Sequence, residues 1–320
     1  MADPTTRAAV KSPVVGHTPN DSACADSFAD AQPRLFAIAY RMTGSVEDAE
    51  DVCQDAWLRY ENATMSRSDT ENPIETPEAY LVRTVTNLAI DKLRSAHHRR
   101  ETYVGAFLPE PIVGVEANTA MCDDPQHAAE LADSLTFAFL VMLDDLQPTE
   151  RAVLLLHDVF GYSFDEVASS VGKTSASCRQ IASRTRKRLD TERSQPCRPS
   201  TSTQRTLIDT MITHTANGDI DALIAMMAPD IVQLDDGGPH RRAARNPIVG
   251  PQRVARLIIN LAKRLSASHS MEIVEVNGVL GILFLDQGEP DMVMTFDYNA
   301  DNLVRRIFLQ LNPEKLRHLT

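Results

Sequence analysis

The sequence predicts a multidomain protein with two all-helical units followed by an α+β domain. Apolar residues recur at helical spacing through residues 27–100 and 131–190, whereas β-branched runs such as IVQLDD and MEIVEVNG occur only after residue 204. A chain of 320 residues is long enough for two or three such domains. We therefore place the domain borders in the polar and Pro-containing stretches 101–130 and 191–203.

Each predicted element has a local signal. Residues 1–26 are rich in Ala, Thr, Pro and Ser and are expected to be disordered. Helices then follow, with a break at Gly44-Ser45 and a new start at Pro77, because Pro is tolerated in the first turn of a helix. Residues 204–320 are expected to form helices and then a bent antiparallel sheet.

Composition narrows the class of protein. The net charge of −12 argues against a general nucleic-acid coat, although basic residues cluster at Lys92–Arg100 and Arg179–Arg198. The five cysteines have no metal-ligand spacing, so neither a metal nor a cofactor is expected. There is no apolar signal core and no run long enough to cross a membrane, so we expect a cytoplasmic protein without membrane contact.

Residues 163–190 predict a helix-turn-helix. Ser163 and Glu166 form a capping box, and Gly172 ends the first helix. The second helix carries an apolar stripe backed by a polar and basic face, which suits packing on one side and major-groove contacts on the other. The alternative is a solvated basic helix in an ordinary bundle.

Two earlier helices also carry unusual surfaces. Residues 47–61 are dense in carboxylates, which indicates either a solvated acidic face or a site for a basic partner. The helix from Pro77 combines Tyr80, Asn87 and several Arg and Lys residues, a set that can stack on bases, read their edges and follow phosphates. An ordinary helix with a basic C-terminal end would look similar.

The motifs RLFAIAYRMTGSVEDAEDVCQDAWLRY and PEAYLVRTVTNLAIDKLRSAHHRR resemble region 2 of bacterial RNA polymerase sigma factors of the extracytoplasmic-function (ECF) class. Residues 143–189 resemble their region 4. The resemblance implies that RNA polymerase core, through its β′ clamp and β flap, and promoter DNA are the partners. It assigns binding of the core to Asp48, Glu50, Asp51, Gln54 and Asp55. It assigns −10 DNA to Tyr80, Arg83, Asn87, Lys92, Arg94, Arg99 and Arg100, with Asn87 at the position that holds a flipped-out base. It assigns −35 DNA to Ser175, Arg179, Gln180, Ser183, Arg184 and Lys187.

The C-terminal part resembles SnoaL-like domains, which implies a cone-shaped α+β fold. YVGAFLPEP, DDGG and NPEKL resemble signatures of the sigma-factor group with such a fused domain, in which that domain regulates the sigma part in cis. No obligatory separate anti-sigma factor is then expected. The interdomain residues assigned by these motifs are Phe107, Leu108, Pro109, Asp235, Asp236, Gly237, Gly238, Asn312 and Pro313. Phe107 and Leu108 lie beside prolines in a stiff, apolar segment able to dock on another surface.

Three further options concern the C-terminal domain and the class of protein. Its pocket could bind a small molecule, since such cones are lined with apolar side chains. Catalysis is not expected, because Asp235, Asp236, His214, His240 and His269 show no paired-carboxylate or His-Asp spacing. A DNA-binding repressor, or a SnoaL-like enzyme with a helix-turn-helix front end, remains as an alternative.

Overall fold

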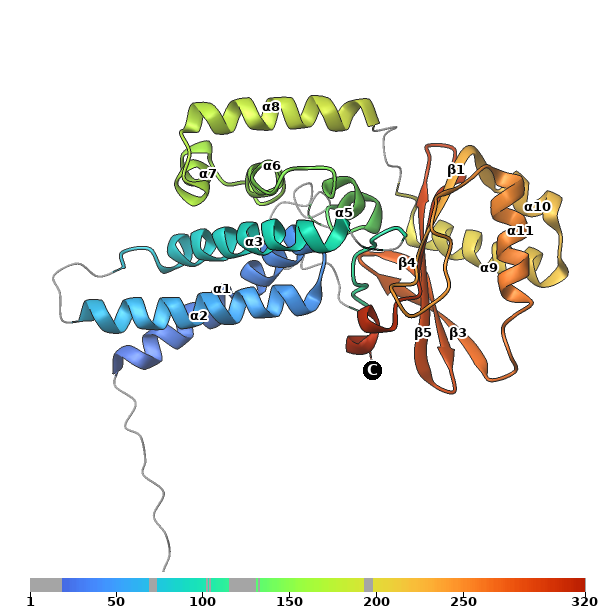
Figure 1. The fold of residues 1–320 in the computed structure, drawn as a ribbon, viewed down its shortest axis with the longest axis horizontal. Coiled ribbons are helices and arrows are strands. Elements are labelled where there is room, and N and C mark those ends of the chain that lie inside the picture. Colours follow the sequence, from blue (N-terminus) through green and yellow to red (C-terminus); the bar gives the residue numbers. More distant parts are fainter. Residues whose placement is uncertain are drawn as a thin grey trace, which may run out of the picture.

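The computed structural model describes residues 19–68, 74–101, 103, 105–114, 131, 133–192 and 198–319. Helices fill the N-terminal part, and a sheet with helices forms the C-terminal part (Figure 1). Residues 103 and 105–114 of the linker run between the two and are called the linker segment below. Two all-helical units followed by an α+β domain are therefore confirmed.

The first helical unit is a bundle of three helices whose break and caps follow the sequence. Gly44 adopts a left-handed φ of 72°, which ends the first helix, and the Ser45 hydroxyl accepts from the Asp48 amide at 3.1 Å to cap the second. The helices are α1 (Pro19–Thr43), α2 (Val46–Ser68) and α3 (Pro77–Glu101).

The expected disorder is wrong for residues 19–26, because α1 already begins at Pro19. Cys24 is buried in the helical core and its thiol reaches the Thr64 hydroxyl of α2 at 3.9 Å. Packing against α2 therefore stabilises a helical turn that composition alone does not predict. Residues 1–18 lie outside the described residues.

The second helical unit continues the same core. Its elements are α5 (Phe137–Leu143), α6 (Pro148–Leu154), the π-helical η2 (Leu155–Val159), α7 (Phe164–Val171) and α8 (Ser175–Glu192). Two buried arginines tie it to α1: Arg151 donates to the Met42 carbonyl at 2.6 Å, and Arg41 donates to the Ser134 hydroxyl at 2.8 Å. The two helical units are thus packed on each other in a closed arrangement.

The C-terminal domain is a six-stranded sheet with helices on one face (Figure 1). Its elements are α9 (Thr201–Asn217), α10 (Ile220–Ala225), β1 (Met227–Asp236), β2 (Ile248–Val249), α11 (Pro251–Ala262), β3 (His269–Val276), β4 (Val279–Asp286), β5 (Glu289–Tyr298), β6 (Val304–Gln310) and the 3-10 turns η3 (Pro313–Lys315) and η4 (Arg317–Leu319).

The sheet is mixed rather than antiparallel, which corrects the sequence prediction. The strand order is β2-β1-β6-β5-β4-β3, and β1 pairs with β6 in parallel. Strands β3 to β6 form an antiparallel meander, and its last strand returns beside β1 in the same direction. Local alternation of apolar residues predicts strands but not the direction in which distant strands pair.

The two faces of the sheet have different cores. On one face α9, α10 and α11 cover an apolar core that includes Ile258, Met294 and Ile307. On the other face Val293 and Phe308 pack with Leu108 of the linker segment and Phe137 of α5. The second face therefore joins the C-terminal domain to the linker segment and the helical units.

Candidate functional site

The linker segment lies against the end of the sheet, and Leu108 is its anchor. This side chain is fully buried in the second core of the sheet. Further along, Val113 forms an antiparallel bridge with Val276 on the edge strand β3, and Gly114 donates to the Glu275 carbonyl at 3.0 Å. The segment is thus held by apolar burial and by backbone pairing to a sheet edge.

A buried ion pair receives the linker segment at the end of β1. Asp236 and Lys315 are 2.8 Å apart, and the Asp236 carboxylate also accepts from the Leu108 amide at 2.9 Å and from the Tyr103 hydroxyl. The Lys315 ammonium donates to the Leu108 carbonyl at 2.6 Å and lies 3.3 Å from the Phe107 ring centroid. Burial raises the pKa of Tyr103, and the hydrogen bond to Asp236 raises it further. Both charges are therefore used to bind the linker segment.

The turn after β1 and the residues after β6 complete this docking site. Gly238 has a φ of 60°, and a Cβ atom there would lie 2.5 Å from Cγ of Asn312. A Cβ atom on Gly237 would lie 2.4 Å from the Arg241 carbonyl oxygen, so both positions require glycine. The Asn312 amide donates to the Tyr103 hydroxyl at 3.1 Å, and Pro313 starts η3, which carries Lys315.

The remaining carbonyls of the linker segment are also bound by the C-terminal domain. Gln310, which is fully buried, donates to the Pro109 carbonyl at 3.1 Å. The Nε2 atom of His318 lies 2.6 Å from the carbonyl oxygen of Pro111. All nine residues predicted as interdomain contacts therefore lie at or beside one interface. Lys315, Gln310 and His318 also contact the linker segment there, although the sequence did not predict them.

Glu110 connects the linker segment to the acidic helix α2. Its carboxylate accepts from the Ser45 hydroxyl at 2.8 Å and from the Val46 amide at 2.7 Å. Its own amide donates to the Gly44 carbonyl, and its carbonyl accepts from the Tyr40 hydroxyl at 2.6 Å. A carboxylate at this place supplies a partner for amides that a helix start leaves unpaired.

Asn277 joins the C-terminal domain to both helical units. It occupies the β3–β4 hairpin turn with a φ of 51° and is fully buried. Its amide donates to the Tyr40 hydroxyl at 2.7 Å and to the Leu135 carbonyl at 2.9 Å, and its side-chain oxygen accepts from the Ile112 amide at 2.8 Å. The Asn-Gly pair predicts a hairpin turn, but nothing local in the sequence indicates these distant partners.

The residues predicted to bind the core enzyme lie on α2. Glu50, Asp51, Gln54 and Asp55 are exposed, while Asp48 is partly buried. Lys92 of α3 bridges Asp48 and Asp51, at 2.8 Å from each carboxylate. Burial lowers the pKa of Lys92, but its hydrogen bonds to these two carboxylates outweigh that effect and raise it. A predicted DNA-binding lysine thus interacts with two of the residues predicted to bind the polymerase.

The predicted −10 residues line α3, where Asn87 contacts the second helical unit. The two N–H groups of its side-chain amide donate to the Arg83 carbonyl at 2.8 Å and to the Ser170 carbonyl of α7 at 2.9 Å. Arg83 and Arg94 are exposed, and Tyr80 is partly buried beside Tyr60. Arg99 and Arg100 belong to α3, but their side chains lie outside the described residues.

The predicted −35 residues lie on α8. Its apolar stripe is buried through Cys178, Ala182 and Leu189. The capping box of Ser163 and Glu166 is present at the start of α7. The predicted contacts Arg179, Gln180, Ser183, Arg184 and Lys187 are exposed. Ser175 is partly buried, and its hydroxyl donates to Asp165.

The titratable residues considered for catalysis are dispersed. His214 pairs with Asp219 at 3.7 Å, His240 with Glu314 at 3.5 Å, and His269 lies between two aspartates. Burial raises the pKa of Asp235, which accepts a hydrogen bond from Gln233 at 2.8 Å. Within the described ranges no cluster of three such side chains suits a metal ion, and no helix there could span a membrane.

Comparisons with known proteins agree with the resemblance. Residues 28–99 match the model of Sigma-70 region 2, and residues 136–189 match that of Sigma-70 region 4. The ECF RNA polymerase sigma factor SigJ of Mycobacterium tuberculosis is 35% identical over 79% of this chain and 78% of its own length. The probable ECF sigma factor SigI of the same species is 30% identical over 62% of this chain and 64% of its own length. A crystal structure of M. tuberculosis SigJ matches with a TM-score of 0.69 and 29% identity, covering 92% of this chain and 98% of that one.

Proposed function

Because the chain belongs to the ECF family of RNA polymerase sigma factors, which direct the core enzyme to promoters, we propose that its C-terminal domain controls this activity in cis. In this proposal the domain holds regions 2 and 4 in a closed arrangement. Promoter recognition then requires the arrangement to open. The C-terminal domain takes the place of a separate anti-sigma factor.

The hydrogen bonds of Asn87 are the observation that carries the proposal. A side-chain amide has two N–H donors, and both are engaged, one by Ser170 of region 4. A flipped-out base at this position would need such donors and the space that α7 occupies. Region 4 therefore has to leave α3 before Asn87 can bind the −10 element.

The C-terminal domain is suited to hold this arrangement. Asn277 bonds Tyr40 of region 2, Leu135 of region 4 and Ile112 of the linker segment. Each hydrogen bond contributes about 1 kcal/mol, and a buried polar group left without partners costs more. Losing all three contacts would therefore favour separation of the regions.

The finer assignments of contacts follow the same proposal. The exposed Glu50, Asp51, Gln54 and Asp55 on α2 would bind the β′ clamp of the core enzyme, and region 4 would bind the β flap. The exposed face of α8 would enter the major groove of the −35 element. The C-terminal domain acts here as a docking domain and not as an enzyme, since Asp235 and Asp236 serve structural hydrogen bonds.

Run-off transcription with purified core enzyme tests the proposal. We expect the full-length Asn277→Gly variant to give more transcript than the unchanged protein, because glycine keeps the positive φ of the turn but loses the three contacts. Asn302→Gly is the matched control: Asn302 has a φ of 59° in an exposed turn and should leave transcription unchanged. Equal or lower transcription by Asn277→Gly would contradict the proposal.

A further inference from the structure

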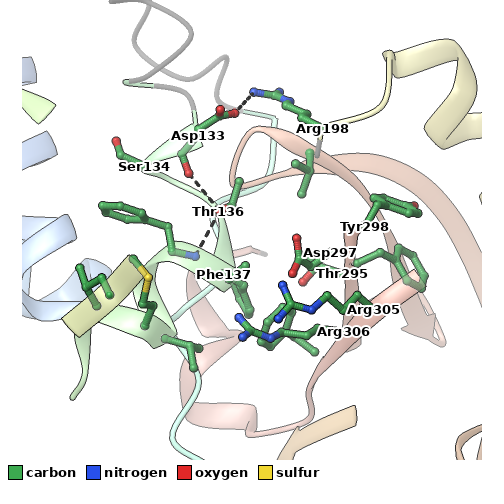
Figure 2. A pocket seen from close by; sticks show the side chains of 18 of the residues that line it. Asp133, Ser134, Thr136, Phe137, Arg198, Thr295, Asp297, Tyr298, Arg305 and Arg306 are labelled. Atoms are coloured by element: carbon green, nitrogen blue, oxygen red, sulfur yellow. Dashed lines mark hydrogen bonds and ion pairs between the residues drawn. The ribbon is translucent and has the colours of Figure 1, made fainter. Parts of the chain in front are cut away.

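A cavity of about 640 Å³ lies between region 4 and the face of the sheet opposite its helices. Figure 2 shows Thr295, Asp297, Arg305 and Arg306 grouped on one side of it, with Thr136 and Phe137 on another. This volume is within the usual range of small-molecule sites, which often form between domains. It differs from the cone interior, where the sequence predicts a pocket and where Ile258, Met292 and Met294 are buried in the core.

The floor of the cavity is built by three neighbouring strands. The strand register places Val232 beside Arg306 and Arg306 beside Asp297. Two residues further along the sheet, Leu234 lies beside Phe308 and Phe308 beside Thr295. Residues two apart on a strand share a face, so all six side chains belong to one face of the sheet. The walls add apolar groups from Phe137, Val141, Leu189 and Pro199.

The polar groups of the floor retain hydrogen-bonding capacity. The Thr295 side chain is 1% exposed, and among the described residues its hydroxyl has no hydrogen-bond partner. Asp297 is buried, which raises its pKa although Arg306 and Arg305 act in the opposite direction. Arg306 forms no ion pair with a carboxylate of the described chain. Buried polar atoms without partners are rare and call for an explanation.

Three other arginines around the cavity are already paired. Arg186 binds Asp158, Arg198 lies 3.4 Å from Asp133, and Arg305 lies 3.6 Å from Asp230. The free capacity on the floor therefore includes the Arg306 guanidinium, the Asp297 carboxyl and the Thr295 hydroxyl, and the Tyr298 hydroxyl beside them also has no partner among the described residues. A head group placed between them has to donate to Asp297 and accept from Arg306 and Thr295.

We propose that this cavity binds a small hydrophobic molecule whose head group both donates and accepts hydrogen bonds, as a carboxamide does. Its apolar body would contact Phe137 and Leu189 of region 4 and Phe308 of the sheet. A bound molecule would touch region 4 and the C-terminal domain together and so stabilise their closed arrangement by mass action. Only this last consequence depends on the function proposed above; the binding itself does not.

Three probes that share a naphthalene body test the head-group requirement on the full-length protein by isothermal titration calorimetry. Naphthalene-2-carboxamide donates and accepts, 2-acetonaphthone only accepts, and 2-naphthoate is an anion that only accepts. We expect one carboxamide per chain with a Kd below about 1 mM, at least about tenfold tighter than either other probe. Absence of saturable carboxamide binding, or equal affinity for all three probes, would overturn the proposal.

Two variants locate the binding. Arg306→Met should weaken carboxamide binding about tenfold, while Arg256→Met, on the exposed surface of α11, should not change it. Thr295→Val should weaken it about fivefold without lowering the melting temperature, because it removes a buried hydroxyl that has no partner. Unchanged affinity in both Arg306→Met and Thr295→Val contradicts the site. The transcription assay of Asn277→Gly reports on the cis control separately, so the two proposals can fail independently.

Discussion

The two helices predicted to contact promoter DNA, α3 and α8, have opposite surroundings. On α3, both amide donors of Asn87 are engaged and Lys92 is held by two carboxylates. On α8, Arg179, Gln180 and Ser183 are exposed. The closed arrangement thus covers part of the surface predicted to bind the −10 element and leaves most of the surface predicted for the −35 element open. Under the proposed cis control, the closed arrangement would therefore affect binding of the −10 element and spare that of the −35 element.

Breaking the buried ion pair should have the largest effect on the difference between α3 and α8. Lys315→Met leaves the fully buried Asp236 carboxylate without its cation, which costs about 3–5 kcal/mol. We expect the linker segment to detach, so that binding of a −10 single strand increases while −35 duplex binding is unchanged. Thermal unfolding and the two binding titrations measure these effects. Lys263→Met at the exposed end of α11 is the control, and an equal loss there would refute the assignment.

Leu108→Ala tests the apolar anchor of the linker segment. Truncation of a fully buried leucine costs about 3 kcal/mol through lost burial and the cavity that remains. Limited proteolysis should then cleave the linker faster, and −10 binding should rise as it does for Lys315→Met. Leu58→Ala removes the same atoms from a side chain that is 46% exposed, and its proteolysis rate should match that of the unchanged protein.

Glu110→Gln tests whether the docked linker segment caps the start of the acidic helix α2. It removes the negative charge that accepts from the first amide of α2, with an expected loss of about 1 kcal/mol. Hydrogen exchange of the Val46 amide should accelerate, and affinity for the core enzyme should fall slightly. Glu272→Gln on the exposed part of β3 should change neither quantity. Unchanged exchange at Val46 would show that Glu110 is not the cap.

Asn87→Ala should change stability as little as Glu110→Gln does, since its hydrogen bond to Ser170 contributes about 1 kcal/mol. Its effect on function should be selective: −10 strand binding is lost, whereas −35 duplex binding is kept. The same titrations measure both. If −35 binding falls equally, Asn87 has a structural role and the contrast between α3 and α8 is wrong.

Local signals predict the helical units well. The capping box at Ser163, the left-handed Gly172 and the buried stripe of α8 all depend on residues within a few positions of each other. The family resemblance predicts that the motifs around Leu108, Asp236 and Asn312 form interdomain contacts. The structure adds which atoms of these motifs meet.

Long-range contacts are the part that the sequence does not reveal. Asn277 and Tyr40 are separated by 237 residues, and an Asn-Gly pair specifies a turn but not its partners. Lysine is a residue type usually found on the surface, yet Lys315 is buried and contacts Asp236, Leu108 and Phe107. The parallel pairing of β1 with β6 and the start of α1 at Pro19 likewise depend on packing between distant segments.

The most direct test of the central claim measures two affinities of the full-length protein without polymerase. One ligand is a single-stranded −10 oligonucleotide of the non-template strand, and the other is a −35 duplex. The account predicts that Asn277→Gly tightens −10 binding several-fold and leaves −35 binding unchanged, while Asn302→Gly changes neither. Unchanged −10 binding in Asn277→Gly, or an equal change for both ligands, would contradict it.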